Sequence, residues 1–139
     1  MAELRSSLVG SWSLVSYETR RADGGDGMTA HPFGDAPIGL FIFDADGNYS
    51  VQLTNPADSG ASTASWGTYD VDEEGVLFIL APIGGTSQPQ LSPGGKTTRR
   101  VTLNGNGTAT FRPPVTTVDG VEIQGYITWK KVSGSSLPS

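Results

Sequence analysis

The chain has 139 residues, a length that suits one domain with one core, and its 19 Gly and 9 Pro are scattered among short apolar runs. This composition favours many turns over long helices and predicts an all-β domain. The net charge of −5 argues against nucleic-acid and anionic-membrane partners. The absence of Cys excludes disulfides, thiolate metal sites and cysteine nucleophiles.

The N-terminal residues lack the apolar stretch of a secretory leader, and no later run approaches the ~20 apolar residues of a membrane helix. We therefore expect a cytoplasmic protein without a membrane partner. The sequence leaves open whether the chain is a monomer or a homodimer.

The first strand is predicted over Leu8 to Tyr17, which is rich in β-branched and aromatic residues. Gly10 stands two places before Trp12, and a glycine there leaves room for another group to approach the indole. We expect this pair to close one end of a barrel. A helical turn over Ala2 to Ser7 is too short to be stable alone, so it would depend on docking beside Trp12.

The other strands are separated by turns rich in Gly, Pro and Asn. Asp46-Gly47 and Asn104-Gly105-Asn106-Gly107 are hairpin signals, because Asn and Gly tolerate the positive φ of primed turns. The predicted strands after the first are Ile38 to Phe43, Asn48 to Thr54, Thr63 to Val71, Val76 to Ala81, Lys96 to Leu103, Thr108 to Arg112 and Val121 to Val132.

About eight strands of this kind fit an up-and-down antiparallel β-barrel wide enough for one small ligand. The tight turns would lie at one end and the long loops at the other, which would be the mouth. The barrel would span residues 1–132, and Ser133 to Ser139 would form a flexible tail. The predicted long loops are Thr19 to Pro37, Asn55 to Ser62, Pro82 to Gly95 and Pro113 to Gly120.

Several segments together resemble the lipocalin-like domain family of bacteria and fungi. They are Leu8 to Tyr17, His31 to Gly34, Asp46 to Leu53, Arg99-Arg100 and Ile127 to Val132. The resemblance implies a small calycin-type β-barrel, and related barrels bind apolar molecules or act as cofactor-free cyclases or isomerases. The chain departs from the family where a histidine-containing strand is usual, because Leu77 to Gly85 is apolar and glycine-rich.

Arg99 and Arg100 are neighbours on a predicted strand, so their side chains face opposite sides of the sheet. Arg99 shares its face with Val101 and Leu103, which predicts that Arg99 points into the barrel. A buried guanidinium must stack or pair. Trp12 and Asp70 are candidate structural partners; alternatively, Arg99 polarises a ligand carbonyl or holds an oxyanion.

Three further residues are candidates for polar chemistry. His31 has an unperturbed pKa near neutrality and stands in a predicted mouth loop, where it would move a proton or remain a solvated loop residue. Gln52 would orient a ligand if the polar face of its strand, which also carries Ser50, points inward; otherwise that face meets solvent. Tyr126 would lie near the rim and is a second candidate for proton transfer.

Large aromatic side chains are numerous enough to fill a core or to line a pocket. In the last strand we expect Ile123, Ile127 and Trp129 to face inward. A metal site is not expected, because His31 is the only histidine. The predicted ligand-binding residues are Trp12, Phe41, Ser50, Trp66, Phe78, Phe111 and Trp129.

The sequence therefore predicts a barrel that binds an apolar small molecule. Its leading function would be a cofactor-free cyclisation, isomerisation or rearrangement in secondary metabolism, with Arg99, Gln52, His31 and Tyr126 acting on the substrate. A binding or carrier protein without turnover is the alternative. A solidly packed barrel that serves as an interaction module is a third possibility.

Overall fold

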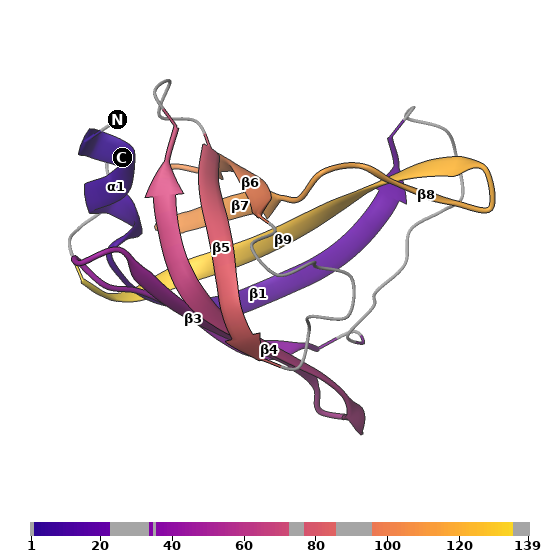
Figure 1. Ribbon diagram of the computed structural model, residues 1–139. Helices are drawn as coiled ribbons and strands as arrows, with labels where there is room; N and C mark the ends of the chain where they lie inside the picture. Colours follow the sequence, from indigo (N-terminus) through magenta and orange to yellow (C-terminus); the bar gives the residue numbers. More distant parts are fainter. Residues whose placement is uncertain (1, 23–33, 35, 73–76, 86–95, 135–139) are drawn as a thin grey trace.

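The computed structural model describes residues 2–22, 34, 36–72, 77–85 and 96–134. One short helix and nine strands lie in these ranges (Figure 1). The elements are α1 (Ala2–Leu8), β1 (Gly10–Arg21), β2 (Ile38–Phe43), β3 (Asn48–Asn55), β4 (Asp58–Val71), β5 (Leu77–Gly85), β6 (Thr97–Leu103), β7 (Thr108–Arg112), β8 (Thr116–Val118) and β9 (Val121–Gly134).

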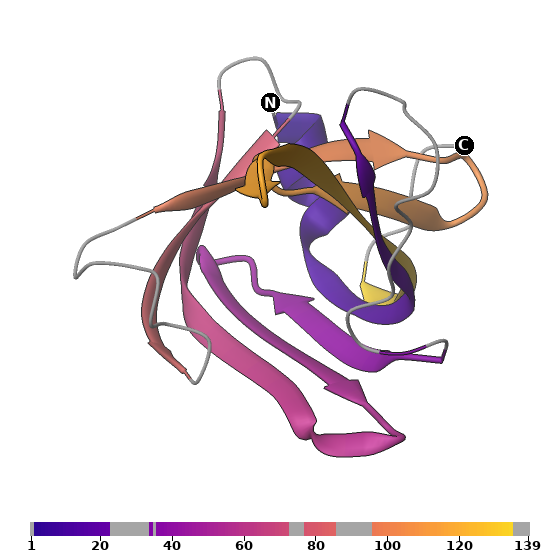
Figure 2. The ribbon, with the colours of Figure 1, turned by 90° about the vertical axis from the view of Figure 1, so that its right-hand side faces the viewer.

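The strands form one antiparallel sheet in the order β1-β2-β3-β4-β5-β6-β7-β9-β8, and β1 also pairs with β9. That second pairing closes eight strands into a barrel, while β8 pairs with β9 outside the ring. Figure 2 shows the strands curling round a common axis. The predicted up-and-down barrel with a helical turn at its N-terminus is confirmed.

Helix α1 covers one end of the barrel (Figure 1), and Trp12 holds it there. The indole Nε1 of Trp12 donates a 2.9 Å hydrogen bond to the carbonyl oxygen of Leu8. Lys131 donates from Nζ to the carbonyl oxygen of Ser7 at 2.6 Å and lies 5.4 Å from the Trp12 ring centroid. Gly10 has a φ of 130°, a conformation that residues with a side chain rarely adopt. Gly10 and Trp12 therefore mark the sealed end, as predicted.

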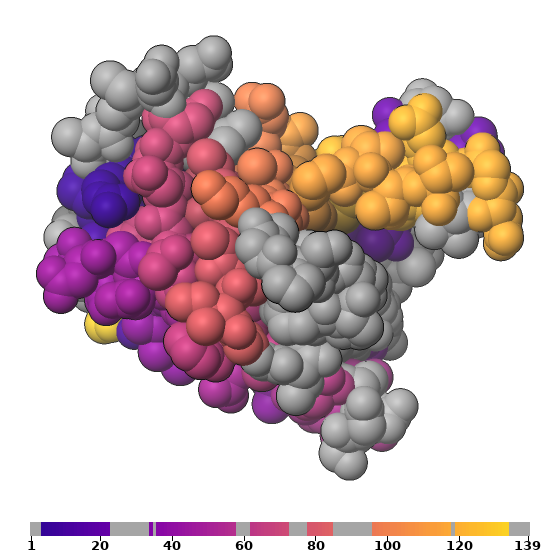
Figure 3. Space-filling model, in the orientation of Figure 1, coloured from indigo at the N-terminus to yellow at the C-terminus, as the bar shows by residue number. Residues whose placement is uncertain are grey.

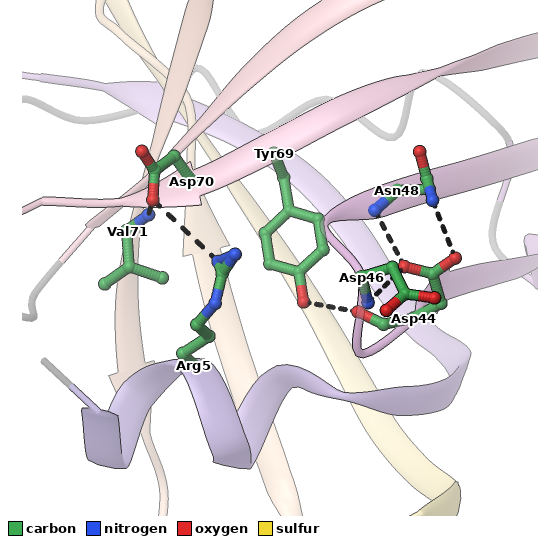
Figure 4. A network of polar contacts seen from close by, with 7 residues as sticks. All are labelled: Arg5, Asp44, Asp46, Asn48, Tyr69, Asp70 and Val71. Atoms are coloured by element: carbon green, nitrogen blue, oxygen red, sulfur yellow. Dashed lines mark hydrogen bonds and ion pairs between the residues drawn. The ribbon is translucent and has the colours of Figure 1, made fainter.

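A polar network at the same end joins α1 to the strands (Figure 4). The guanidinium of Arg5 lies 5.2 Å from the ring centroid of Tyr69, and its Nη1 lies 3.8 Å from Asp70 Oδ1. The hydroxyl of Tyr69 donates a 2.7 Å hydrogen bond to the carbonyl oxygen of Asp44. The Asp44 carboxylate in turn accepts from the backbone and side-chain nitrogens of Asn48. The β2–β3 turn is thus fixed to β4 and the helix.

The connections alternate between the two ends, as predicted, but one expected loop is absent. The segment Asn55 to Ser62 is a hairpin, in which β3 and β4 continue to the pair Asn55 and Asp58. The side-chain oxygen of Asn55 accepts from the backbone nitrogen of Ala57 at 3.0 Å, so the turn closes over Pro56. The expectation of a long loop here was wrong, because proline and asparagine form the turn itself.

Further strand boundaries differ from the prediction. Strand β1 begins at Gly10, because Leu8 belongs to α1, and it continues past Tyr17 to Arg21, since Thr19 to Arg21 still pair with β9. Strand β5 continues through Pro82, which lies at a register shift opposite Gly67 and beyond the residues of β5 that pair with β6. The predicted connection Pro113 to Gly120 contains β8. Strand β9 extends to Gly134, because Ser133 and Gly134 still pair with β1. The remaining predicted tail, residues 135–139, lies outside the described residues.

Replacing Trp12 by Phe removes the indole donor that holds α1 and leaves a small cavity. We expect the free energy of unfolding to fall by about 1–3 kcal/mol. Trp66→Phe is the matched control, since Trp66 is 52% exposed whereas Trp12 is fully buried, and its effect should stay below about 1 kcal/mol. Urea unfolding of both variants measures the difference. Equal losses in the two variants would contradict the anchoring role of Trp12.

Candidate functional site

Five of the aromatic residues predicted to bind a ligand meet inside the barrel: Trp12, Phe41, Phe78, Phe111 and Trp129. Each is at most 4% exposed. The Phe78 and Phe111 ring centroids are 4.9 Å apart at 81°, and those of Phe41 and Trp129 are 5.4 Å apart at 79°. These are the edge-to-face contacts that aromatic rings favour. The five rings fill the part of the barrel next to α1 and form an apolar base.

Ser50, Gln52 and Trp66 lie on the outer face of the barrel. In β3 the buried residues alternate with them, so Val51 points inward while Gln52 is exposed. Trp66 is the cross-strand partner of Ser50 and of Gly84, and its indole lies over Gly84, where an added Cβ would come within 2.7 Å of the ring nitrogen. The polar face of β3 is its solvent face. The structure therefore does not bring these three side chains to the interior.

Arg99 points into the barrel, on the same face of β6 as the half-buried Val101, and this orientation agrees with the prediction. Its Nη1 donates to Thr97 Oγ1 at 3.0 Å and to the carbonyl oxygen of Thr98 at 2.8 Å. Both acceptors are on the same strand, and both are neutral. Burial lowers the pKa of the Arg99 guanidinium, which means that the surroundings disfavour its charge.

Two tyrosines face this guanidinium from other strands. Tyr17 of β1 and Tyr49 of β3 both interact electrostatically with Arg99. Burial is the main reason that the pKa of each phenol is raised, and the cation opposes that rise. Both phenols are therefore neutral hydrogen-bonding groups at neutral pH. Together with Arg99 they place one cation and two hydroxyls inside the barrel.

Neither structural partner that the sequence suggested for Arg99 is realised. Asp70 is exposed and forms its ion pair with Arg5 at the sealed end. Trp12 has Lys131, not Arg99, over its ring. The ion pairs within the described part of the chain are Arg5 with Asp70 and Arg20 with Glu18, so no carboxylate there neutralises Arg99.

Several polar residues of the interior were not predicted from the sequence. Ser65 is buried, and its hydroxyl is hydrogen-bonded to that of Tyr49 at 2.7 Å. Thr63 lies on the same face of β4, opposite the buried Leu53, and its buried Oγ1 has no hydrogen-bond partner among the described residues. The same is true of Trp129 Nε1. The sequence Thr63-Ala64-Ser65 was the available signal for these polar groups, because residues two apart on a strand share a face and this spacing places two hydroxyls on the same side of the sheet.

Tyr126, one of the two remaining predicted proton-transfer residues, is not at Arg99. Tyr126 is on the outer face of β9, between the buried Gly125 and Ile127, and Arg20 lies 5.1 Å from its ring centroid. His31 lies outside the described residues. The inward orientation of Ile123, Ile127 and Trp129 is confirmed by their burial. Three of the four residues predicted to act on a substrate are described by the structure. Of these three, Arg99 faces the interior of the barrel, whereas Gln52 and Tyr126 lie on its outer face.

Two kinds of feature are absent from the described ranges. No cluster of three or more His, Cys, Asp or Glu side chains there could hold a metal ion. Among the same residues, no helix is both long and apolar enough to cross a membrane.

Arg99→Met tests whether the buried cation serves the fold. Because the guanidinium is desolvated and bonded to neutral groups of its own strand alone, we expect the free energy of unfolding to stay within about 1 kcal/mol of wild type or to rise. Arg100→Met on the outer face is the matched control. A loss above about 3 kcal/mol in Arg99→Met alone would show that Arg99 is a structural clamp.

The raised pKa values of Tyr17, Tyr49 and Tyr69 predict a loss of stability at high pH. Unfolded tyrosines ionise near 10.0, whereas these three keep their protons to higher pH in the folded state. The unfolded state is therefore favoured as pH rises above about 10. Ultraviolet titration should show late phenolate formation, reduced by one group in Tyr49→Phe. Simultaneous ionisation of these phenols at their ordinary pKa would contradict the burial.

The chain is similar to a known family over part of its length and to solved β-barrels. A family model described as a lipocalin-like domain matches residues 9–66. A redesigned β-barrel aligns with 94% of this chain and 96% of its own, at 17% identity and a TM-score of 0.50. A de novo designed fluorescence-activating β-barrel aligns with 95% of this chain and 100% of its own, at 12% identity and a TM-score of 0.47. No curated protein matches the chain. The family match over residues 9–66 confirms the resemblance found in the sequence for that part of the chain, and the described residues form a closed β-barrel.

Proposed function

We propose that this barrel binds a small, mostly apolar molecule and holds one anionic or strongly polarised oxygen of that molecule against Arg99. The lipocalin-like fold suggests small-molecule binding in general. The observation that carries the finer proposal is the partly buried, inward-facing guanidinium, whose hydrogen bonds go to Thr97 and Thr98 and whose charge no described carboxylate balances.

The energetic argument rests on the cost of burying a charge. An unpaired ion inside a protein costs several kcal/mol after relaxation, so a chain without a use for it is more stable with an apolar residue there. A bound carboxylate, enolate or carbonyl oxygen would offset that cost through a charge-assisted hydrogen bond. Tyr17 and Tyr49 would add neutral donors beside the cation.

The apolar part of the ligand follows from the base of the barrel. The aromatic rings next to α1 form a buried apolar cluster inside the barrel, and we infer that the apolar body of a ligand packs against the edge of this cluster, since rings prefer edge contacts with other rings. A ligand with an aromatic or alicyclic body and one oxyanion would therefore match both parts of the interior. The unpartnered Thr63 hydroxyl and Trp129 indole N–H would be further hydrogen-bonding positions.

Calorimetric titration with 1-naphthoate and with its methyl ester tests the proposal. Wild type should bind the carboxylate at least about tenfold more tightly than the ester, because only the carboxylate forms a charge-assisted pair with Arg99. Arg99→Met should lose this preference and still bind the ester, while Lys130→Gln, which removes an exposed positive charge outside the barrel interior, should keep it. Equal affinity of wild type for the two compounds would refute the role of Arg99.

We propose catalysis as a second function of the same cluster, in the form of a cofactor-free isomerisation, cyclisation or rearrangement. The observation that favours it is the pairing of a cation with neutral phenols, since this combination stabilises an enolate formed from a bound carbonyl compound. The proton leaves the carbon next to the carbonyl and passes to water, and the enolate oxygen stays on Arg99.

Deuterium exchange at this carbon separates an enzyme from a carrier. An aryl methyl ketone in D₂O should exchange its methyl protons faster with wild type than with Arg99→Met, as followed by proton nuclear magnetic resonance. Tyr49→Phe should give an intermediate rate, and Tyr126→Phe on the outer face should match wild type. Exchange at the uncatalysed rate, together with tight naphthoate binding, would identify a carrier.

A further inference from the structure

A groove with a volume of about 210 Å³ lies on the outside of the barrel, where β6 and β7 meet the connection to β8. Arg100, Arg112, Thr98 and Gln124 supply its polar lining, and Pro113 to Val115 form its apolar wall. Figure 3 shows the segment that follows β7, in orange and yellow, projecting from the body of the molecule. We refer to this site as the arginine groove. It is distinct from the interior, because Arg100 and Arg99 are successive residues of one strand and face opposite sides.

The two arginines of the groove are held side by side. Arg100 and Arg112 are direct cross-strand partners in the β6–β7 pair, so their side chains leave the same face of the sheet. Like charges at such positions are destabilising. The ion pairs seen between two described residues are Arg5 with Asp70 and Arg20 with Glu18, and neither includes Arg100 or Arg112. The repulsion between Arg100 and Arg112 is therefore not offset by a described carboxylate.

The wall of the groove is fixed in place. Gln124 donates from Nε2 to the carbonyl oxygen of Pro113 at 2.6 Å and to that of Gly125 at 3.1 Å. The Pro113 ring also packs over Gly125, where an added Cβ would lie 3.1 Å from the proline Cγ. Strand β9 thus positions the proline-rich connection opposite the arginines. A ligand would meet a preformed site, which lowers the entropic cost of binding.

We propose that the arginine groove binds the oxyanion of a small molecule, such as a carboxylate or a phosphate monoester, between Arg100 and Arg112. Guanidinium groups recognise these planar or tetrahedral oxyanions through paired N–H donors. The hydroxyl of Thr98 supplies another donor, and a short apolar group of the ligand packs on Pro114 and Val115. The chain as a whole has a charge of −5, so the attraction is local to the groove.

Titration with phenyl phosphate and with benzoate, each monitored by the arginine side-chain N–H resonances, tests the proposal. We expect saturable shifts of the Arg100 and Arg112 resonances with at least one of the two compounds, and the tighter one identifies the preferred oxyanion. Arg100→Gln and Arg112→Gln should each weaken binding at least about tenfold. Lys130→Gln is the matched control, because it removes an exposed positive charge from the outer face of β9.

The stability of the unliganded variants gives a second readout. Removing one arginine relieves the repulsion, so Arg100→Gln should unfold at or above the wild-type temperature. In an Arg99→Met background, which lacks the interior cation, ligand should raise the melting temperature, whereas the double variant Arg99→Met/Arg100→Gln should show no such rise. A purely structural role would lower the melting temperature instead. The proposal is overturned if neither compound binds at millimolar concentration, if both arginine variants bind as wild type does, or if Arg99→Met abolishes all binding.

Discussion

Pairing between β1 and β9 is the constraint on which the rest of the structure depends. It runs from Gly10 opposite Gly134 to Arg21 opposite Ile123 and joins the two ends of the sheet. Once the sheet is closed, each strand has one face toward the interior and one toward solvent, and a slip of one residue would exchange them. The chemistry of the barrel is therefore decided by register, because register determines which polar side chains are enclosed.

The alternation of apolar and polar residues along a strand correctly predicted which side chains face the interior wherever one face of the strand carries large apolar residues. In β9, Ile127 and Trp129 share a face and are buried, and in β6 Val101 identified Arg99 as the inward arginine. Alternation did not decide between the two faces of β3. It also could not place Trp66, whose indole lies over Gly84 on the outer face, because the pairing of these two residues depends on a register shift between β4 and β5.

Strand ends were harder to predict than strands, because proline and glycine usually indicate loops. Pro82 lies in β5, where it needs no partner for its missing N–H, as β6 pairs no further than Leu80. Asn55 and Pro56 end a strand and reverse it at once.

The groups around Arg99 could not be predicted for a different reason. Tyr17 and Tyr49 come from strands distant in the sequence, and only the closed sheet brings them together.

Arg99 and Arg100 show how one dipeptide can serve two separate environments. The inward cation is opposed by desolvation, and the outward cation by the like charge of Arg112. Neither effect is offset by a carboxylate in the described ranges, although the chain has 14 acidic and 9 basic residues. Described acidic residues form their contacts elsewhere: the carboxylates of Asp44 and Asp70 bind Asn48 and Arg5 at the sealed end. Because no carboxylate of the described residues is paired with either cation, both proposals have the same physical basis, in which an external oxyanion supplies the missing negative charge.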